Sequence, residues 1–170
     1  MNDISAEGIL SLVNEAMNQH HTVTISTRDN ESVWSATVFY VSDSSLNLFF
    51  LSAEKSKHIQ QINFNKNVSA TIYKDQKDWE KIKGIQLTGE VTKIDGVKRD
   101  EVINNYLSKY DFLQRVMNSP LNENEKKIGS QFRTIPFFIL KPNFIRLIDN
   151  SIVFGHKEEI QLESGSWVKI

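Results

Sequence analysis

The feature that most constrains the fold is a series of short β-strand patterns, the first three of which follow one another with only turns between them. Residues 23–26 alternate between apolar and hydroxyl side chains, and the polar turn 28–30 follows them. Residues 33–41 and 46–51 are the next two apolar segments of strand length. Parallel neighbours would need a long crossover between each pair of strands. The sequence therefore predicts antiparallel strands rather than a βαβ sheet.

The rest of the chain adds further strands and several helices. Residues 4–18 have the apolar spacing of an amphipathic helix, with Asp3 or Ser5 as its predicted cap. A short helix over 55–64 bridges the third and fourth strands. Gly89 interrupts its strand and predicts a bulge or a close backbone approach. The remaining predicted strands are 68–72, 85–94, 135–140, 144–148 and 152–154, and further helices are predicted over 102–110 and 112–117, with partly helical structure over 122–131. This order predicts a mainly β protein with helices (α+β), built on a small antiparallel barrel of six or more strands, with an N-terminal helix and a helical insertion.

Two strands carry more apolar surface than one small barrel can bury. Residues 33–41 have bulky side chains on both faces, which predicts a strand buried on both sides. Residues 135–140 are similarly apolar. Since a large apolar patch normally marks an interface, the sequence predicts a homodimer.

Composition limits the classes of function. The length of 170 residues fits a single domain over 1–170. Lys plus Arg total 20 against 21 for Asp plus Glu, which gives no positive field to attract nucleic acid. The chain has no cysteine, which excludes disulfides and thiolate chemistry. No apolar segment approaches the roughly 20 residues of a membrane span and the start lacks a signal-peptide pattern, so we expect no membrane association and a cytoplasmic location.

A possible anion site lies where the third strand gives way to the helix. The segment FFLSAEKSKHIQQI, residues 49–62, places Ser52, Ser56 and Lys57 at the first turn of that helix. Hydroxyl groups, an ammonium group and free backbone N–H groups together suit a phosphate. The alternative is an ordinary solvated helix cap.

The histidines and tryptophans give no catalytic or metal site. His20 and His21 are adjacent on a predicted strand, so their side chains point in opposite directions and cannot share a metal. His58 either helps to neutralise a phosphate or is exposed in the first helical turn. Trp34 belongs to the core or to a dimer interface, with stacking on a planar ligand as the alternative. No residue is marked as a proton donor or acceptor, which fits a protein whose cofactor carries the chemistry.

Three blocks of the chain resemble a known superfamily. They are SATVFYVSDSSLNLFFLSAEKSKHIQQINFNKNVSATIY, GIQLTGEV over Gly84–Val91, and PNFIRLIDNSIVFGHK over Pro142–Lys157. In order and spacing they resemble the pyridoxamine 5'-phosphate oxidase-like superfamily, and the last two resemble the small, uncharacterised YhbP-type family. The resemblance covers most of Thr22–Ile160. It implies an FMN-binding split barrel that dimerises with the flavin at the subunit interface.

The resemblance also implies which residues bind the cofactor. One strand of the family runs beneath the isoalloxazine ring, and the next strand edge and turn hold the ribityl chain and phosphate. Lys57 matches the lysine that pairs with the phosphate. The full set implied here is Ser35, Ala36 and Thr37 for the ring, Phe50, Leu51, Ser52, Ser56 and Lys57 for the ribityl chain and phosphate, and Gln86 from the YhbP-type block.

Some residues depart from the pattern of the oxidase itself. Ser35 and Ser56 stand where the oxidase has arginines, and the loss of two guanidinium groups should weaken FMN binding. The oxidase's substrate-binding Arg and His pair is also missing, which argues against pyridoxal phosphate synthesis.

Two functions follow from these observations. The first is an FMN-dependent oxidoreductase acting on a small-molecule electron donor or acceptor. The second is a non-catalytic binding module that holds a flavin, haem or another planar ligand weakly, or that acts through its dimer. The residues do not distinguish FMN from a deazaflavin.

Overall fold

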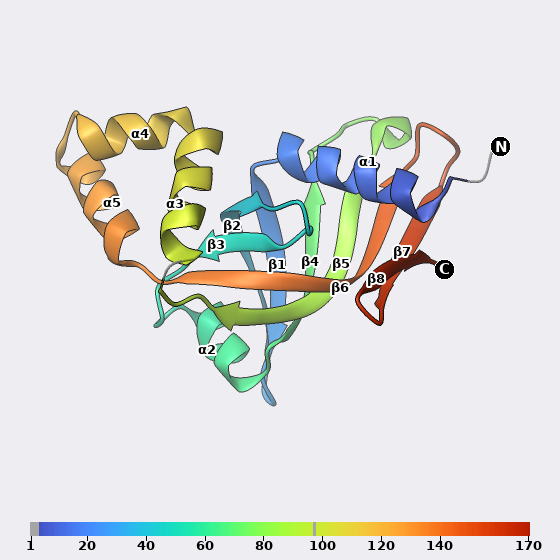
Figure 1. Cartoon of the computed structure of the whole chain (residues 1–170), viewed down its shortest axis with the longest axis horizontal. Coiled ribbons are helices and arrows are strands. Elements are labelled where there is room, and N and C mark those ends of the chain that lie inside the picture. Colours follow the sequence, from blue (N-terminus) through green and yellow to red (C-terminus); the bar gives the residue numbers. More distant parts are fainter. Residues whose placement is uncertain (1–3, 97) are drawn as a thin grey trace.

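The computed structural model describes residues 4–96 and 98–170 as helices and strands joined by short loops (Figure 1). The helices are α1 (Ala6–Gln19), α2 (Lys57–Phe64), the 3-10 helix η1 (Trp79–Lys81), α3 (Lys98–Lys109), α4 (Asp111–Asn118) and α5 (Glu123–Thr134). The strands are β1 (Thr22–Arg28), β2 (Val33–Ser42), β3 (Leu48–Leu51), β4 (Asn67–Tyr73), β5 (Lys83–Lys93), β6 (Phe137–Asp149), β7 (Lys157–Glu163) and β8 (Ser166–Lys169). None of the described helices is both long and apolar enough to cross a membrane.

The strands form one antiparallel sheet that closes into a barrel. Its order is β3-β2-β1-β4-β5-β6-β7-β8, and a further pairing of β3 with β6 joins the first six strands into a ring. Strands β7 and β8 extend the sheet beyond the ring (Figure 1). The predicted antiparallel barrel, the N-terminal helix and the helical insertion between β5 and β6 are confirmed.

Two apolar clusters hold these elements together. The barrel interior includes Ile25, Ile72 and Ile85, and the buried face of α1 joins it through Ile9, Val13 and Met17. The second cluster lies between the sheet and the helices α3, α4 and α5. It includes Val41, Phe49, Tyr106, Phe132 and Phe137.

The cap of α1 follows the sequence prediction. The Ser5 side chain accepts a hydrogen bond from the Gly8 backbone N–H at 3.2 Å. The other predicted cap, Asp3, lies outside the described residues.

The β5–β6 pair contains a bulge that corrects one prediction. Residues 135–140 and 144–148 were predicted as two strands because Lys141-Pro142-Asn143 separates them, but β6 is continuous. The register shifts between Thr88 and Gly89, and Pro142 lies opposite Gly89. A Cβ on Gly89 would lie 2.3 Å from the Lys141 carbonyl oxygen, so the predicted close approach and bulge are both present. A bulge accommodates proline within a sheet, which explains the continuity.

Two further predictions on the strands are wrong. Residues 152–154 form an exposed turn rather than a strand. Strand β2 is not buried on both sides, since Val33 is 79% exposed and Phe39 is 50% exposed. The cause is that β2 pairs with β3 only over Tyr40–Ser42, which leaves its first part at an open edge.

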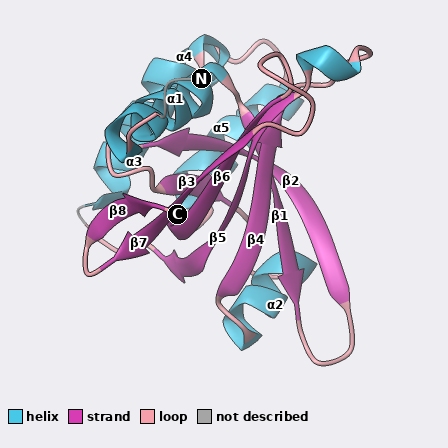
Figure 2. Ribbon diagram, turned by 90° about the vertical axis from the view of Figure 1, so that its right-hand side faces the viewer, coloured by secondary structure: helices cyan, strands magenta, loops and turns pink. Residues whose placement is uncertain are grey.

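Helix α2 lies beside the hairpin between β1 and β2 (Figure 2). A buried glutamine, Gln61, joins the two. The Gln61 amide oxygen accepts a hydrogen bond from the Thr27 hydroxyl at 2.6 Å. Its amide nitrogen donates to Asp29 Oδ2 and to the carbonyl and hydroxyl oxygens of Ser32, each at 3.1 Å. The bond from Gln61, followed by those from the backbone of Ser32 and Glu31, lowers the pKa of Asp29 to about 2. This network fixes the position of α2.

We expect Gln61→Leu to lower the free energy of unfolding by about 2 kcal/mol, because the substitution removes the short bond from the buried Thr27 hydroxyl, whose other acceptor is 3.5 Å away, and the bonds to Asp29 and Ser32. Urea denaturation measures the change. Gln60→Leu is the matched control, since Gln60 is exposed on the same helix and its replacement should change stability by less than about 0.5 kcal/mol. Equal losses in the two variants would contradict the role of the network.

Candidate cofactor-binding site

The candidate site is the opening where β2 and β3 separate. The two strands pair at Tyr40–Phe50, Val41–Phe49 and Ser42–Leu48 only. Beyond Phe50, β3 continues against β6, and the chain passes through residues 52–56 into α2. Figure 2 shows α2 beside β1 and the β1–β2 hairpin, and the contact of Lys57 with Trp34 places the start of α2 near the unpaired part of β2.

The backbone of β2 presents unpaired groups to this opening. The Tyr40 N–H donates to the His21 carbonyl on the β1 side at 3.3 Å. Since hydrogen-bonded and non-hydrogen-bonded pairs alternate in an antiparallel ladder, Val38 and Ala36 also face β1, whereas Thr37 and Ser35 direct their N–H and C=O groups away from it. Within the described residues no strand pairs with that edge at these positions. The edge can therefore bind the polar rim of a planar ligand.

The side chains of the predicted ring-binding residues lie on two faces. Ser35 and Thr37 are on the outer face, where their hydroxyls lie 3.0 Å from Ser26 Oγ and 2.9 Å from Thr24 Oγ1. Ala36 alternates with them and lies opposite the buried Ile25. A ligand at this edge would meet the backbone and two small hydroxyl side chains.

Ser52 and Ser56 come together as predicted, and His58 joins them. The two hydroxyl oxygens lie 3.0 Å apart, and His58 Nε2 is 2.7 Å from Ser52 Oγ and 3.4 Å from Ser56 Oγ. The Ser56 hydroxyl donates to the Ala53 carbonyl at 2.8 Å and makes no cap bond to α2. The first N–H groups of α2 are therefore not capped by this side chain.

Lys57 lies at the first position of α2 and faces β2. Its ammonium nitrogen is 4.9 Å from the centre of the Trp34 ring. The nearby acid Glu54 is bonded to Lys93 at 2.6 Å, which lowers the pKa of Glu54. The acid of this loop is thus already paired, and Lys57 remains available to an anion.

The side chains of Phe50 and Leu51 pack against other apolar side chains of the protein. Phe50 is fully buried and stacks on Phe138 with ring centres 5.6 Å apart, and Leu51 packs against the cluster beneath the helices. Neither side chain points into open space. Their contribution to a ligand would come from the backbone alone.

Gln86 lies away from the other predicted residues. It is on β5. Across the sheet, Thr37 of β2 lies opposite Thr24 of β1, Thr24 opposite Thr71 of β4, and Thr71 opposite Gln86, which itself lies opposite Arg146 of β6. Three strand spacings separate Thr37 from Gln86, which is roughly 14 Å. The Gln86 amide oxygen accepts from Arg146 Nη1 at 3.2 Å. Within one chain, β1 and β4 therefore lie between Gln86 and the predicted ring-binding residues of β2.

The sequence did not identify two residues that shape this site. Tyr106 on α3 was only one member of an apolar helix face, yet its hydroxyl lies 2.8 Å from the Phe39 carbonyl and 3.0 Å from the Phe49 carbonyl, at the point where the strands separate. His58 was left between two roles, and it is buried, with 8% of its surface exposed. No group of three or more potential metal ligands occurs among the described residues.

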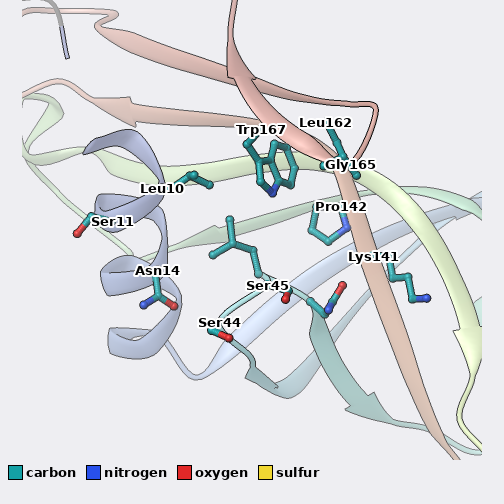
Figure 3. A pocket seen from close by; sticks show the side chains of 12 residues that line it. Leu10, Ser11, Asn14, Ser44, Ser45, Lys141, Pro142, Leu162, Gly165 and Trp167 are labelled. Atoms are coloured by element: carbon teal, nitrogen blue, oxygen red, sulfur yellow. The ribbon is translucent and has the colours of Figure 1, made fainter. Parts of the chain in front are cut away.

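A cavity of about 500 Å³ lies elsewhere, between α1, the turn at residues 44–47 and the β7–β8 hairpin (Figure 3). Leu10, Pro142 and Trp167 line it together with small polar side chains. None of the predicted cofactor-binding residues lines this cavity. It is separate from the candidate site.

The chain is similar to YhbP proteins in sequence. It is 25% identical over 149 residues to the UPF0306 protein YhbP of Salmonella choleraesuis, a match that covers 87% of this chain and 90% of the relative. No family model matches. The predicted resemblance to the YhbP-type family is confirmed.

Solved structures share the fold at low sequence identity. A pyridoxamine 5'-phosphate oxidase-related, FMN-binding protein of Nostoc punctiforme superimposes with a TM-score of 0.64 at 11% identity, covering 99% of this chain and 97% of the other. A haem-binding protein of Mycobacterium smegmatis gives a TM-score of 0.64 at 12% identity, covering 95% and 60%. These likenesses confirm the split-barrel fold.

His58 gives the site a pH-dependent contribution to stability. Burial lowers its pKa from 6.5, so the unfolded chain binds the proton more readily than the folded one. As the pH falls through 6.5 toward the folded pKa, the free energy of unfolding should therefore decrease. Urea denaturation at pH 7.5 and 5.5 measures this decrease, which should be smaller in His58→Gln. Equal decreases in the two proteins would contradict the burial of a neutral imidazole.

Proposed function

We propose that this YhbP-type split-barrel protein binds FMN at the opening between β2 and β3. The observation that carries the proposal is that the Ser52 and Ser56 hydroxyls meet at the start of α2, where the Ser56 side chain makes no cap bond, and that Lys57, the first residue of α2, lies over Trp34 of the unpaired β2 edge. The phosphate would lie at the start of α2, within the reach of the serine hydroxyls, the backbone N–H groups and the flexible Lys57 side chain. The isoalloxazine ring would lie along Ser35–Thr37.

The dimensions of the edge support this placement. Trp34 lies within cation–π distance of Lys57, and Thr37 is three residues further along β2. At the rise of an extended strand, this separation is roughly 10 Å. A ligand that extends from Lys57 along the edge would reach the free N–H and C=O groups of Ser35 and Thr37.

The residues fit FMN in part. Ser35 and Ser56 replace the arginines of the oxidase, so the phosphate would have one formal cation, Lys57, and neutral donors besides. Such a site should bind FMN more weakly than one with bidentate guanidinium groups. We therefore expect a flavin that exchanges with the solvent.

The proposed activity is that of an oxidoreductase for a small-molecule electron donor or acceptor. When bound, FMN would supply hydride or electron transfer. The chain would orient the ring through the β2 backbone and hold the phosphate at α2. The freshly purified protein, or the protein mixed with FMN, should show the absorbance of a bound oxidised flavin, and no change on addition of FMN would contradict the proposal.

A second candidate function is the binding of haem or another planar ligand without catalysis. The likeness to the haem-binding protein of Mycobacterium smegmatis supports this reading at the level of the fold. A titration with haem distinguishes the two. A haem spectrum that changes on addition of the protein, together with a flavin spectrum that does not, would favour the second function.

We further propose that two copies associate through β2. Val33, Trp34 and Phe39 are exposed on β2, and an apolar strand edge of this kind is normally covered. The other strand that motivated a dimer, residues 135–140, gives no support, because Phe137–Leu140 are buried within the chain. Sedimentation should give about twice the chain mass of 19.6 kDa, and a single species at the chain mass would contradict the dimer.

Lys57→Ala tests the phosphate position. The substitution removes the only formal cation assigned to the phosphate, and a hydrogen bond to a charged group is worth roughly 1.5 to 3 kcal/mol. FMN affinity should therefore fall about tenfold to a hundredfold. Riboflavin, which lacks the phosphate, should bind the wild type and the variant equally, and fluorescence titration measures both ligands.

Lys55→Ala is the matched control for this substitution. Lys55 carries the same charge two residues earlier and is exposed, so its replacement should have a small effect on FMN that disappears at high salt. If Lys57→Ala and Lys55→Ala weakened FMN equally, the phosphate would have no specific contact with Lys57.

A further inference from the structure

The hydrogen atoms of the Ser52, Ser56 and His58 cluster can be assigned by elimination. Ser56 has one hydroxyl hydrogen, and it goes to the Ala53 carbonyl at 2.8 Å. Ser56 Oγ can therefore only accept from Ser52 Oγ, 3.0 Å away, or from His58 Nε2, 3.4 Å away. The direction of the Ser52 hydrogen depends on His58.

The shortest contact of the cluster, 2.7 Å between Ser52 Oγ and His58 Nε2, has two possible directions. If Nε2 carries no hydrogen, Ser52 donates to it and has no hydrogen left for a ligand. If Nε2 carries the hydrogen, it donates to Ser52, and the Ser52 hydroxyl hydrogen can then go to another acceptor, either Ser56 Oγ at 3.0 Å or a ligand. Only the second arrangement makes Ser52 a donor to an anion.

We propose that His58 is a positioning residue that turns the Ser52 hydroxyl toward the phosphate by donating to it through Nε2–H. The inference rests on the proposed function, since it assumes that the phosphate lies at the start of α2. It separates the roles of the two serines. Ser52 donates to the phosphate, whereas Ser56 is held by Ala53 and completes the cluster.

The surroundings of His58 favour a neutral ring, for which the choice of tautomer matters. Burial lowers its pKa. The charged groups around it have other positions or partners: Lys57 lies over Trp34, Lys55 is exposed, Glu54 is paired with Lys93, and Asp29 is bonded to Gln61. No carboxylate is bonded to the imidazole among the described residues.

NMR spectroscopy of the full chain with ¹⁵N-labelled histidine reports the tautomer directly. In the FMN complex at pH 7.5, His58 Nε2 should have the shift of a protonated nitrogen and Nδ1 that of a bare one. A residue that only fills space would have no required tautomer. A bare Nε2 in the FMN complex would overturn the proposal.

Matched variants give a second readout. His58→Gln keeps an N–H donor on the side chain and should retain FMN affinity within about threefold, whereas His58→Phe should lose about tenfold. Ser52→Ala should lose about tenfold and Ser56→Ala less than threefold. Riboflavin affinity should be unchanged in all four variants, which also shows that each one folds.

The outcomes separate this inference from the proposed function. If Lys57→Ala leaves the ratio of FMN to riboflavin affinity unchanged, the phosphate does not lie at α2 and the proposed function fails. If Lys57→Ala lowers that ratio while His58→Phe equals His58→Gln, the phosphate site holds and the role of His58 is wrong.

Discussion

The separation of β3 from β2 after the Tyr40–Phe50 pair is the constraint on which the candidate site depends. Strand β3 is only four residues long, and all of them pair with β6. This pairing closes the barrel, but from Val33 to Phe39 it leaves β2 paired with β1 alone and without a neighbour on the β3 side. An unpaired edge is a liability unless another group covers it. The same constraint therefore creates both the opening and its capacity to bind a ligand or a second copy.

The helical insertion holds this opening in shape. Tyr106 and Tyr110 extend from α3 and the start of α4 toward the ends of β1, β2 and β3, where their hydroxyls lie within hydrogen-bond distance of the backbone carbonyls of Phe39 and Phe49 and of His21 and Tyr40, respectively. Burial raises the pKa of both phenols, to about 12 for Tyr110, so each remains a donor across the physiological range. The insertion thus compensates for hydrogen bonds that the sheet loses where it splits. Figure 1 shows it packed at the end of the barrel where β3 lies.

The sequence predicted those features that depend on local pattern. Alternation identified the strands, and Gly89 marked the bulge because only a residue without a Cβ allows the Lys141 carbonyl so close. Features that depend on tertiary pairing were not predictable. Lys141-Pro142-Asn143 has the composition of a turn, and only the opposing bulge makes it part of a strand. The burial of His58 and the distance of Gln86 from α2 depend on packing and register, which no periodicity reports.

The predicted group of Ser52, Ser56 and Lys57 at the start of α2 shows the same contrast between features set by local pattern and features set by tertiary packing. Spacing alone placed Ser52, Ser56 and Lys57 on one turn, and the structure brings the two hydroxyls within 3.0 Å. The imidazole that completes the group comes from the next residue, His58, because the Gln61 network turns this face of α2 toward the hairpin. A sequence pattern cannot distinguish that orientation from an exposed first turn.

A hydroxyl-based anion site differs physically from an arginine-based one. A guanidinium group donates several hydrogen bonds in a fixed geometry, whatever surrounds it. A serine has one hydrogen, and its direction is set by whichever acceptor or donor lies nearest. In this chain the nearest group to Ser52 is the buried imidazole of His58. His58 is on α2, and the hydrogen bonds of Gln61 join α2 to the β1–β2 hairpin, so the direction of the Ser52 hydroxyl depends on these bonds as well. Because the hairpin also forms one side of the opening, the anion site and the planar edge are held by the same network and should be lost together when it breaks.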